Sequence, residues 1–148
     1  MLKVLARGIA ALTVLAALAA AGPAVGGDRA YSANFENGGT ISFELNQGNR
    51  PRVHDISIKG ITATCEEGRN GYFIFDIYGW TPVLADRSFA VRSESEDGKA
   101  KAVVRGKFSR SFKRAEGTAR VHGKLQDPEL GWVRCDSDKQ KFVAKLSG

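Results

Sequence analysis

Residues 102–125 read AVVRGKFSRSFKRAEGTARVHGKL, two runs in which small or apolar residues alternate with polar ones. Side chains alternate across a β-strand, so this pattern predicts a β-hairpin with one apolar and one polar face. The apolar face pairs Ala and Gly residues with Phe108, and such small side chains indicate that another layer packs closely against them. We therefore expect the remainder of the chain to be β structure that covers this hairpin.

Similar short alternating runs occur before and after the hairpin, and Gly, Pro, Asn and Asp residues separate them. No segment after the first 26 residues has helical periodicity. The sequence predicts an all-β fold, a single-domain antiparallel β-sandwich or small barrel of about eight or nine strands. The alternation also predicts the most buried residues: Ile41, Phe43, Ile56, Ile58, Phe73, Phe75, Val104, Phe108, Ala119, Val121 and Phe142.

The first 26 residues have the three parts of a secretory signal peptide. Lys3 and Arg7 precede an apolar segment, and small residues that favour cleavage follow at 19–21 and 24–26. The apolar segment is shorter than the ~20 residues of a membrane-spanning helix, and no later segment is apolar enough to span a membrane. We expect a signal peptide at 1–26 and a secreted domain, extracellular or periplasmic, at 27–148.

The chain has two cysteines, Cys65 and Cys135. An even number of cysteines in an exported protein favours a disulfide. The alternatives are a zinc site, which would need further ligands close by, and a redox pair, which would usually have C-x-x-C spacing. We expect a structural disulfide between the two residues.

The pattern of GTISFEL, then a strand that ends at Cys65, then GKFSRSFKRAEGTARV, then CDS before FVA resembles small secreted bacterial proteins of unknown function that are thought to be β-sandwiches. The resemblance extends over residues 39–146. It implies the fold and export, and it brings no catalytic residue.

No catalytic motif is present: the chain lacks G-x-S-x-G, H-E-x-x-H and a Gly-rich phosphate loop before a helix. His122 falls on the polar face of the hairpin, which is typical of a solvated side chain. His54 shares the alternation of Ile56 and Ile58, which favours a strand residue whose ring bonds a carbonyl. We predict no enzymatic activity and no cofactor, with a secreted enzyme or enzyme inhibitor as the alternative.

A disulfide would bring together acidic residues beside the two cysteines. The four carboxylates are those of Glu66, Glu67, Asp136 and Asp138. Clustered carboxylates can hold Ca²⁺, which prefers six to eight oxygen ligands. The alternative is two solvated loops with Arg69 and Arg134 as counter-ions, and we expect no metal site.

Basic residues are concentrated in the hairpin. Residues 99–124 contain nine Lys or Arg and one acid, Glu116, whereas the rest of the predicted secreted domain has a net charge of −4. Five of these cations share the outward face of the two strands: Lys101, Arg105, Lys107, Arg120 and Lys124. Such a face attracts anionic envelope polymers, glycans or lipid head groups, although Lys on a strand can also serve only solubility and edge protection. Nucleic acid is a poorer candidate, because export removes that partner and no aromatics alternate with the charges.

Residues 72–80 predict a strand that is apolar on both faces. One face carries Phe73, Phe75 and Ile77, and the other carries Tyr72, Tyr78 and Trp80. The second face is either covered by another sheet or exposed as an aromatic surface for sugar rings or an apolar ligand, with Trp132 as a further member. The sequence thus predicts a secreted, disulfide-stabilised binding module. The ligand and the oligomeric state are not specified by it.

Overall fold

A computed structural model describes residues 27–148, so the predicted signal peptide lies outside the described residues. Within them the protein is all β structure apart from one short 3₁₀ turn at Glu66–Gly68. The strands are β1 (Arg29–Asn34), β2 (Thr40–Asn46), β3 (Arg52–Cys65), β4 (Asn70–Ile77), β5 (Thr81–Pro82), β6 (Ser88–Glu94), β7 (Ala100–Phe108), β8 (Arg114–Asp127), β9 (Gly131–Asp136) and β10 (Gln140–Leu146). No helix in residues 27–148 is long and apolar enough to cross a membrane.

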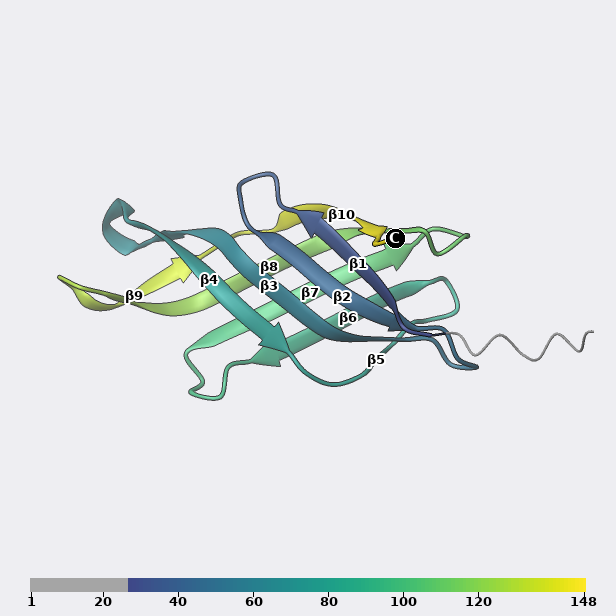
Figure 1. Cartoon of the computed structure of the whole chain (residues 1–148). Helices are drawn as coiled ribbons and strands as arrows, with labels where there is room; N and C mark the ends of the chain where they lie inside the picture. Colours follow the sequence, from purple (N-terminus) through teal and green to yellow (C-terminus); the bar gives the residue numbers. More distant parts are fainter. Residues whose placement is uncertain (1–26) are drawn as a thin grey trace, which may run out of the picture.

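All ten strands belong to one antiparallel sheet that folds over on itself. One layer contains β4, β3, β2 and β1, and the other contains β8, β7 and β6; Figure 1 shows the strands of the two layers crossing each other. Two strands join the layers along one side. β10 pairs with β1 and with the first half of β8, and β9 pairs with the last two residues of β3 and the second half of β8. This arrangement confirms the predicted all-β fold, with ten strands in place of eight or nine.

The core lies between the two layers and is rich in aromatic rings. All eleven residues predicted to be most buried are less than 9% exposed, so the predicted alternation is correct in β2, β4, β7, β8 and β10. The rings of Tyr31, Phe43, Phe89, Phe108 and Phe142 form a connected cluster with centroid separations of 5.3–6.2 Å.

The small residues of the hairpin make room for these rings. Gly106 and Gly117 are direct cross-strand partners. A Cβ atom on Gly106 would lie 2.5 Å from the Phe89 ring, and one on Gly117 would lie 2.6 Å from the Phe142 ring. The expected close packing is therefore present, but these two rings come from the neighbouring strands β6 and β10 and not from the opposite layer.

A β-bulge in β3 changes the alternation at His54. The pairing of β2 with β3 shifts between Ser42 and Glu44, and Asp55 has a positive φ of 49°. An extra residue in a bulge reverses the side-chain phase beyond it. His54 therefore shares the outer face with its partner Glu44, although it is only 6% exposed. The expectation that His54 follows Ile56 and bonds a carbonyl is wrong, because its ring contacts carboxylates.

The predicted disulfide is present. Cys65 and Cys135 are cross-strand partners at the junction of β3 and β9, with their Cα atoms 3.9 Å apart. The disulfide thus links β3 and β9, two strands that pair with each other at only two positions. The crosslink holds β9 between the two layers, where it completes one side of the groove described next.

Candidate anion-binding groove

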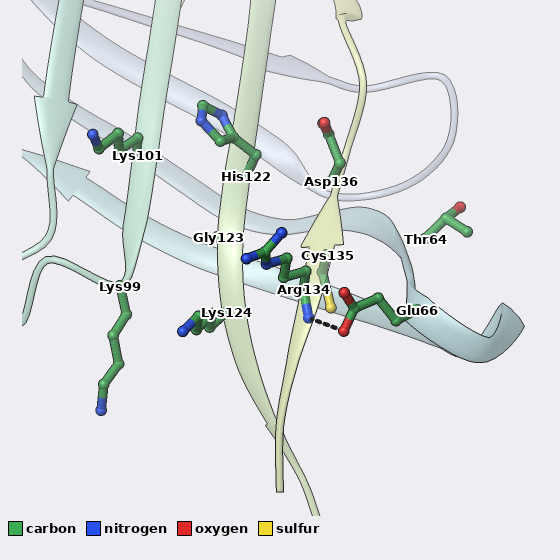
Figure 2. Close-up of a pocket in the computed structure, with 10 residues that line it drawn as sticks. All are labelled: Thr64, Glu66, Lys99, Lys101, His122, Gly123, Lys124, Arg134, Cys135 and Asp136. Carbon is green, nitrogen blue, oxygen red and sulfur yellow. Dashed lines mark hydrogen bonds between the residues drawn. The ribbon is translucent and has the colours of Figure 1, made fainter. Parts of the chain in front are cut away.

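A groove of about 730 Å³ lies on the outer face of β7, β8 and β9. The end of β3 forms its fourth side. Figure 2 shows the ten side chains and backbone positions that line it: Thr64, Glu66, Lys99, Lys101, His122, Gly123, Lys124, Arg134, Cys135 and Asp136. Four of these ten residues carry permanent positive charges.

Strand register explains how the cations converge. Lys124 of β8 is the direct partner of Arg134 of β9, and Lys101 of β7 is the direct partner of His122. Lys99 lies beside Lys124 because its carbonyl accepts a hydrogen bond from the Lys124 N–H at 2.9 Å. A Cβ atom on Gly123 would lie 2.2 Å from the Lys99 carbonyl oxygen, so the glycine permits this close approach.

The acids of the groove leave its cations largely uncompensated. The Glu66 carboxylate accepts a hydrogen bond from the backbone N–H of Arg134 at 3.2 Å, as Figure 2 shows. Asp136 instead binds Arg120, which donates from Nε at 2.9 Å and from Nη2. Among the described residues no carboxylate lies within ion-pair distance of the Lys124 or Arg134 side chain.

The other two lysines have weak contacts. Lys101 Nζ lies 3.8 Å from Glu94, and Lys99 Nζ lies 4.0 Å from Asp97; all four side chains are at least 40% exposed. Such surface pairs contribute roughly 0–1 kcal/mol and are easily exchanged for another anion. Lys99 Nζ also lies 3.6 Å from the centre of the Trp132 ring, a cation–π contact at the edge of the groove.

The ion pair of Arg120 with Asp136 affects both groups. The hydrogen bond from the Arg120 guanidinium lowers the pKa of Asp136, in spite of partial burial that raises it, and the charge of His122 adds to the lowering. The same bond raises the pKa of Arg120. Arg120 is thus engaged with a neighbour in the sheet and only partly available to a ligand.

The structure brings together two of the five cations predicted from the sequence. Lys101 and Lys124 line the groove, and Arg120 lies next to it in the pair with Asp136. Arg105 is exposed further along β7, and Lys107 lies 4.0 Å from Asp86. Sequence reasoning missed Arg134, which it treated as a counter-ion for the acids, and His122, which it treated as solvated. Strand pairing alone brings them to the groove.

The predicted acidic group does not converge. Glu66 turns to the backbone of β9 and Asp136 to Arg120. Within residues 27–148, the group of three acidic or histidine ligands whose donor atoms lie within 4.8 Å of one another is a different one: Asp28, Glu44 and His54.

The predicted aromatic surface is exposed but divided. Tyr72, Tyr78 and Trp80 are 63%, 82% and 55% exposed, so the second layer does not cover them. Tyr72 and Trp80 line different pockets, Tyr72 with Leu125 and Trp80 with Arg52. Trp132, the further member, lies at the anion groove. Tyr72, Trp80 and Trp132 thus border separate hollows of the surface.

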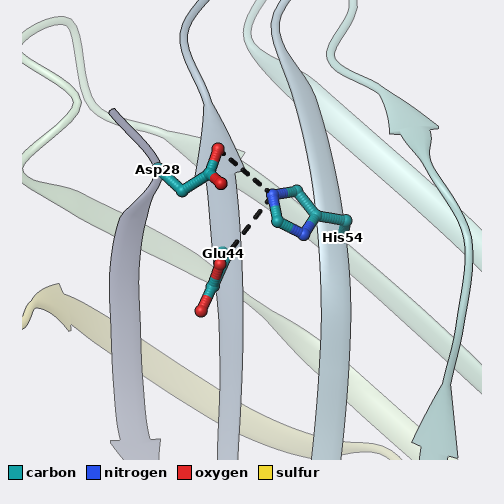
Figure 3. A group of neighbouring side chains, drawn as sticks. All are labelled: Asp28, Glu44 and His54. Atoms are coloured by element: carbon teal, nitrogen blue, oxygen red, sulfur yellow. Dashed lines mark ion pairs between the residues drawn. The ribbon is translucent and has the colours of Figure 1, made fainter. Parts of the chain in front are cut away.

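A second polar cluster lies on the outer face of the opposite layer, at the ends of β1, β2 and β3. Figure 3 shows Asp28 and Glu44 facing the His54 ring, with Nε2 3.4 Å from Asp28 and 3.9 Å from Glu44. Burial lowers the pKa of His54, but the polar contacts with Asp55 and Asp28 and the charges of these two carboxylates outweigh it, so that the pKa is raised overall. The hydrogen bond from Asn46 lowers the pKa of Asp28.

No family model matches the chain, and no curated protein matches it significantly.

Proposed function

We propose that the protein is an exported, disulfide-stabilised binding module that holds an anionic polymer, such as an acidic glycan or envelope polymer, in the groove of β7, β8 and β9. The disulfide supports export to an oxidising compartment, because intracellular thiols are usually kept reduced. The resemblance to secreted bacterial β-sandwich proteins favours the same compartment.

One observation carries the binding proposal. Lys124 and Arg134 are directly opposite each other on neighbouring strands, and no carboxylate of the described residues pairs with either side chain. Like charges in direct cross-strand positions are destabilising. Lys99 and Lys101 add two more cations to the same groove. A chain that concentrates charge at a cost in stability is well suited to bind a ligand of opposite charge there.

The groove suits a polymer better than a small buried ligand. It is open along the sheet, and its cations follow three adjacent strands that lie ~5 Å apart. At physiological salt the Debye length is about 8 Å, so neighbouring cations act together on one chain of anionic groups. The Lys99–Trp132 contact places an aromatic face beside the charges, which suits a sugar ring.

Charge reversal tests the proposal. We expect the protein to bind dextran sulfate but not neutral dextran, and to release it as salt concentration rises. The double variant Lys124→Glu/Arg134→Glu should weaken binding at least tenfold. The matched control, Lys59→Glu/Arg50→Glu, makes the same change in net charge at exposed positions on β3 and in the loop before it. Equal losses in the two variants would mean that net charge alone governs binding, and would contradict a groove-specific role.

A secreted enzyme or enzyme inhibitor remains the alternative function. An enzyme would need titratable groups that converge in a cleft. The groove holds His122 beside Asp136, but Asp136 is engaged by Arg120. The observations therefore favour the binding module.

A further inference from the structure

The cluster of His54, Asp28 and Glu44 has the composition and spacing of a metal site. We propose that it binds a divalent transition-metal ion of the Zn²⁺ type through His54 Nε2 and one carboxylate oxygen each from Asp28 and Glu44. This site lies on the opposite layer from the anion groove and is independent of the function proposed for that groove.

The spacing of the donor atoms fits such an ion. The three donor atoms lie within 4.8 Å of one another, with His54 Nε2 3.4 Å from Asp28 Oδ1 and 3.9 Å from Glu44 Oε2. Donors about 2.0–2.2 Å from a tetrahedral Zn²⁺ are separated from each other by about 3.3–3.6 Å. The two distances from His54 Nε2 are therefore within a few tenths of an ångström of those in a tetrahedral site.

The unpartnered nitrogen of His54 points to a ligand. The His54 side chain is 93% buried, and its Nε2 atom, directed at the two carboxylates, is fully buried and has no aligned hydrogen-bond partner. A buried polar atom without a hydrogen bond is unfavourable in a folded protein. A metal ion bound between Nε2 and the two carboxylates would satisfy all three groups at once.

Asp55 and Asn46 hold two of the proposed ligands in place through hydrogen bonds, as residues around a metal site usually do. Asp55 Oδ2 lies 3.0 Å from His54 Nδ1 and accepts a hydrogen bond from it, which directs the Nε2 lone pair to Asp28 and Glu44. A carboxylate in this position is the usual partner of a metal-binding histidine. Asp55 reaches it from the bulge position with positive φ, so the irregularity in β3 positions the ligand. Asn46 Nδ2 likewise fixes Asp28 through a 3.0 Å hydrogen bond to Oδ1.

The donor set selects the class of ion. An imidazole nitrogen suits Zn²⁺, Cu²⁺, Ni²⁺ and Fe²⁺, whereas Ca²⁺ and Mg²⁺ prefer oxygen ligands only. Three protein ligands leave a fourth position for water or another small ligand. The Trp80 ring packs at a tilt against the His54 ring, with centroids 4.1 Å apart, and it borders a cleft of about 400 Å³ that is also lined by Asn46 and Arg52.

To test the proposal, the complete secreted domain is freed of metal and titrated with Zn²⁺ in a calorimeter. We expect one Zn²⁺ per chain and a rise in melting temperature. His54→Gln should weaken the affinity at least tenfold, and the matched control His122→Gln, which removes the other histidine, should leave it unchanged. Glu44→Gln should also weaken Zn²⁺ binding. Because Glu44 is half-exposed, this variant tests the site even if replacing the buried His54 impairs folding. Neither His54→Gln nor Glu44→Gln should alter dextran sulfate binding.

Fluorescence gives a readout from the site itself. In a Trp132→Phe variant Trp80 is the one remaining tryptophan, and Zn²⁺ should change its emission because the ring lies on His54. Absence of saturable Zn²⁺ binding would overturn the proposal. So would Zn²⁺ binding that survives His54→Gln and Glu44→Gln, or equal stabilisation by Ca²⁺ or Mg²⁺.

Discussion

The ion pair of Arg120 with Asp136 should make stability depend on pH. Asp136 has a lowered pKa in the folded protein because Arg120 donates to it and His122 lies nearby, while Asp138 also faces Arg120. A carboxyl group of this kind stabilises the fold above its unfolded pKa, near 3.8, and that stability is lost as pH falls through the folded pKa. Between about pH 6 and pH 3, urea unfolding should show a larger loss for the wild type than for Asp136→Asn. Because both side chains are more than a third exposed, we expect a difference below about 1 kcal/mol. Identical pH profiles would show that the pair contributes nothing.

The same variant tests whether Arg120 can serve the groove. Asp136→Asn removes the carboxylate that engages the guanidinium and one of the two acids that line the groove. Freeing one cation from a surface ion pair corresponds to roughly 0.5–1 kcal/mol, so dextran sulfate should bind about two- to fivefold more tightly. Isothermal titration at low salt measures this change, with Asp97→Asn, at the exposed partner of Lys99, as a comparison. Weaker binding by Asp136→Asn would mean that Asp136 orders the groove more than it neutralises it.

At the residue scale, sequence reasoning located most buried side chains and failed at His54. The alternation rule assumes that each residue reverses the side-chain direction, and a bulge breaks that rule by one residue. The segment RVHDISI gives no sign of the bulge in the sequence. The positive φ, which usually indicates a glycine, is adopted here by Asp55. The metal cluster was therefore not predictable: its three ligands are distant in sequence and meet only through this irregular pairing.

Among the elements, the hairpin of β7 and β8 is the one whose packing most limits substitution. Ala119 is fully buried, and it lies opposite Val104 of β7 and Gln140 of β10. Ala119→Leu should overpack this position and lower the free energy of unfolding by about 1–3 kcal/mol. Thr118→Leu, at the neighbouring outward position, should change it by less than about 0.5 kcal/mol. Denaturant unfolding of the two variants checks this, and similar effects at both positions would contradict the observed facing of β8.

The hairpin was predictable because its pattern is local. Alternation over twenty-four residues determines which side chains face the core, and the structure places Ala102, Val104, Phe108, Ala119 and Val121 there. Its partners were not predictable. The Phe89 and Phe142 rings that occupy the space over the glycines come from separate strands, and their positions depend on pairing between distant segments.

On the scale of the whole molecule, the groove arises from the way β9 joins the two layers. Lys101 and Lys124 could be assigned to one face from the hairpin alone, whereas Arg134 reaches them only because β9 pairs with β8. The sequence therefore predicted the charge of the site but neither its full set of residues nor its concave shape.

The Cys65–Cys135 bond should contribute more stability than any noncovalent contact described above. It closes a loop of 70 residues, and the chain-entropy model gives about 4 kcal/mol for a loop of that length. We expect Cys65→Ser/Cys135→Ser to lose about this much unfolding free energy and reduced wild type to behave like the variant. Since β3 and β9 share only two paired positions, reduction should also let Glu66 and Thr64 move away from Arg134. Dextran sulfate binding, measured on folded reduced protein, should then tighten slightly, because one of the two acids of the groove moves away from its cations. Zn²⁺ binding should be unchanged, because that site is formed by Asp28 and by residues of β2 and the first half of β3. A loss of less than about 1 kcal/mol on reduction would show that noncovalent pairing alone holds β9 in place.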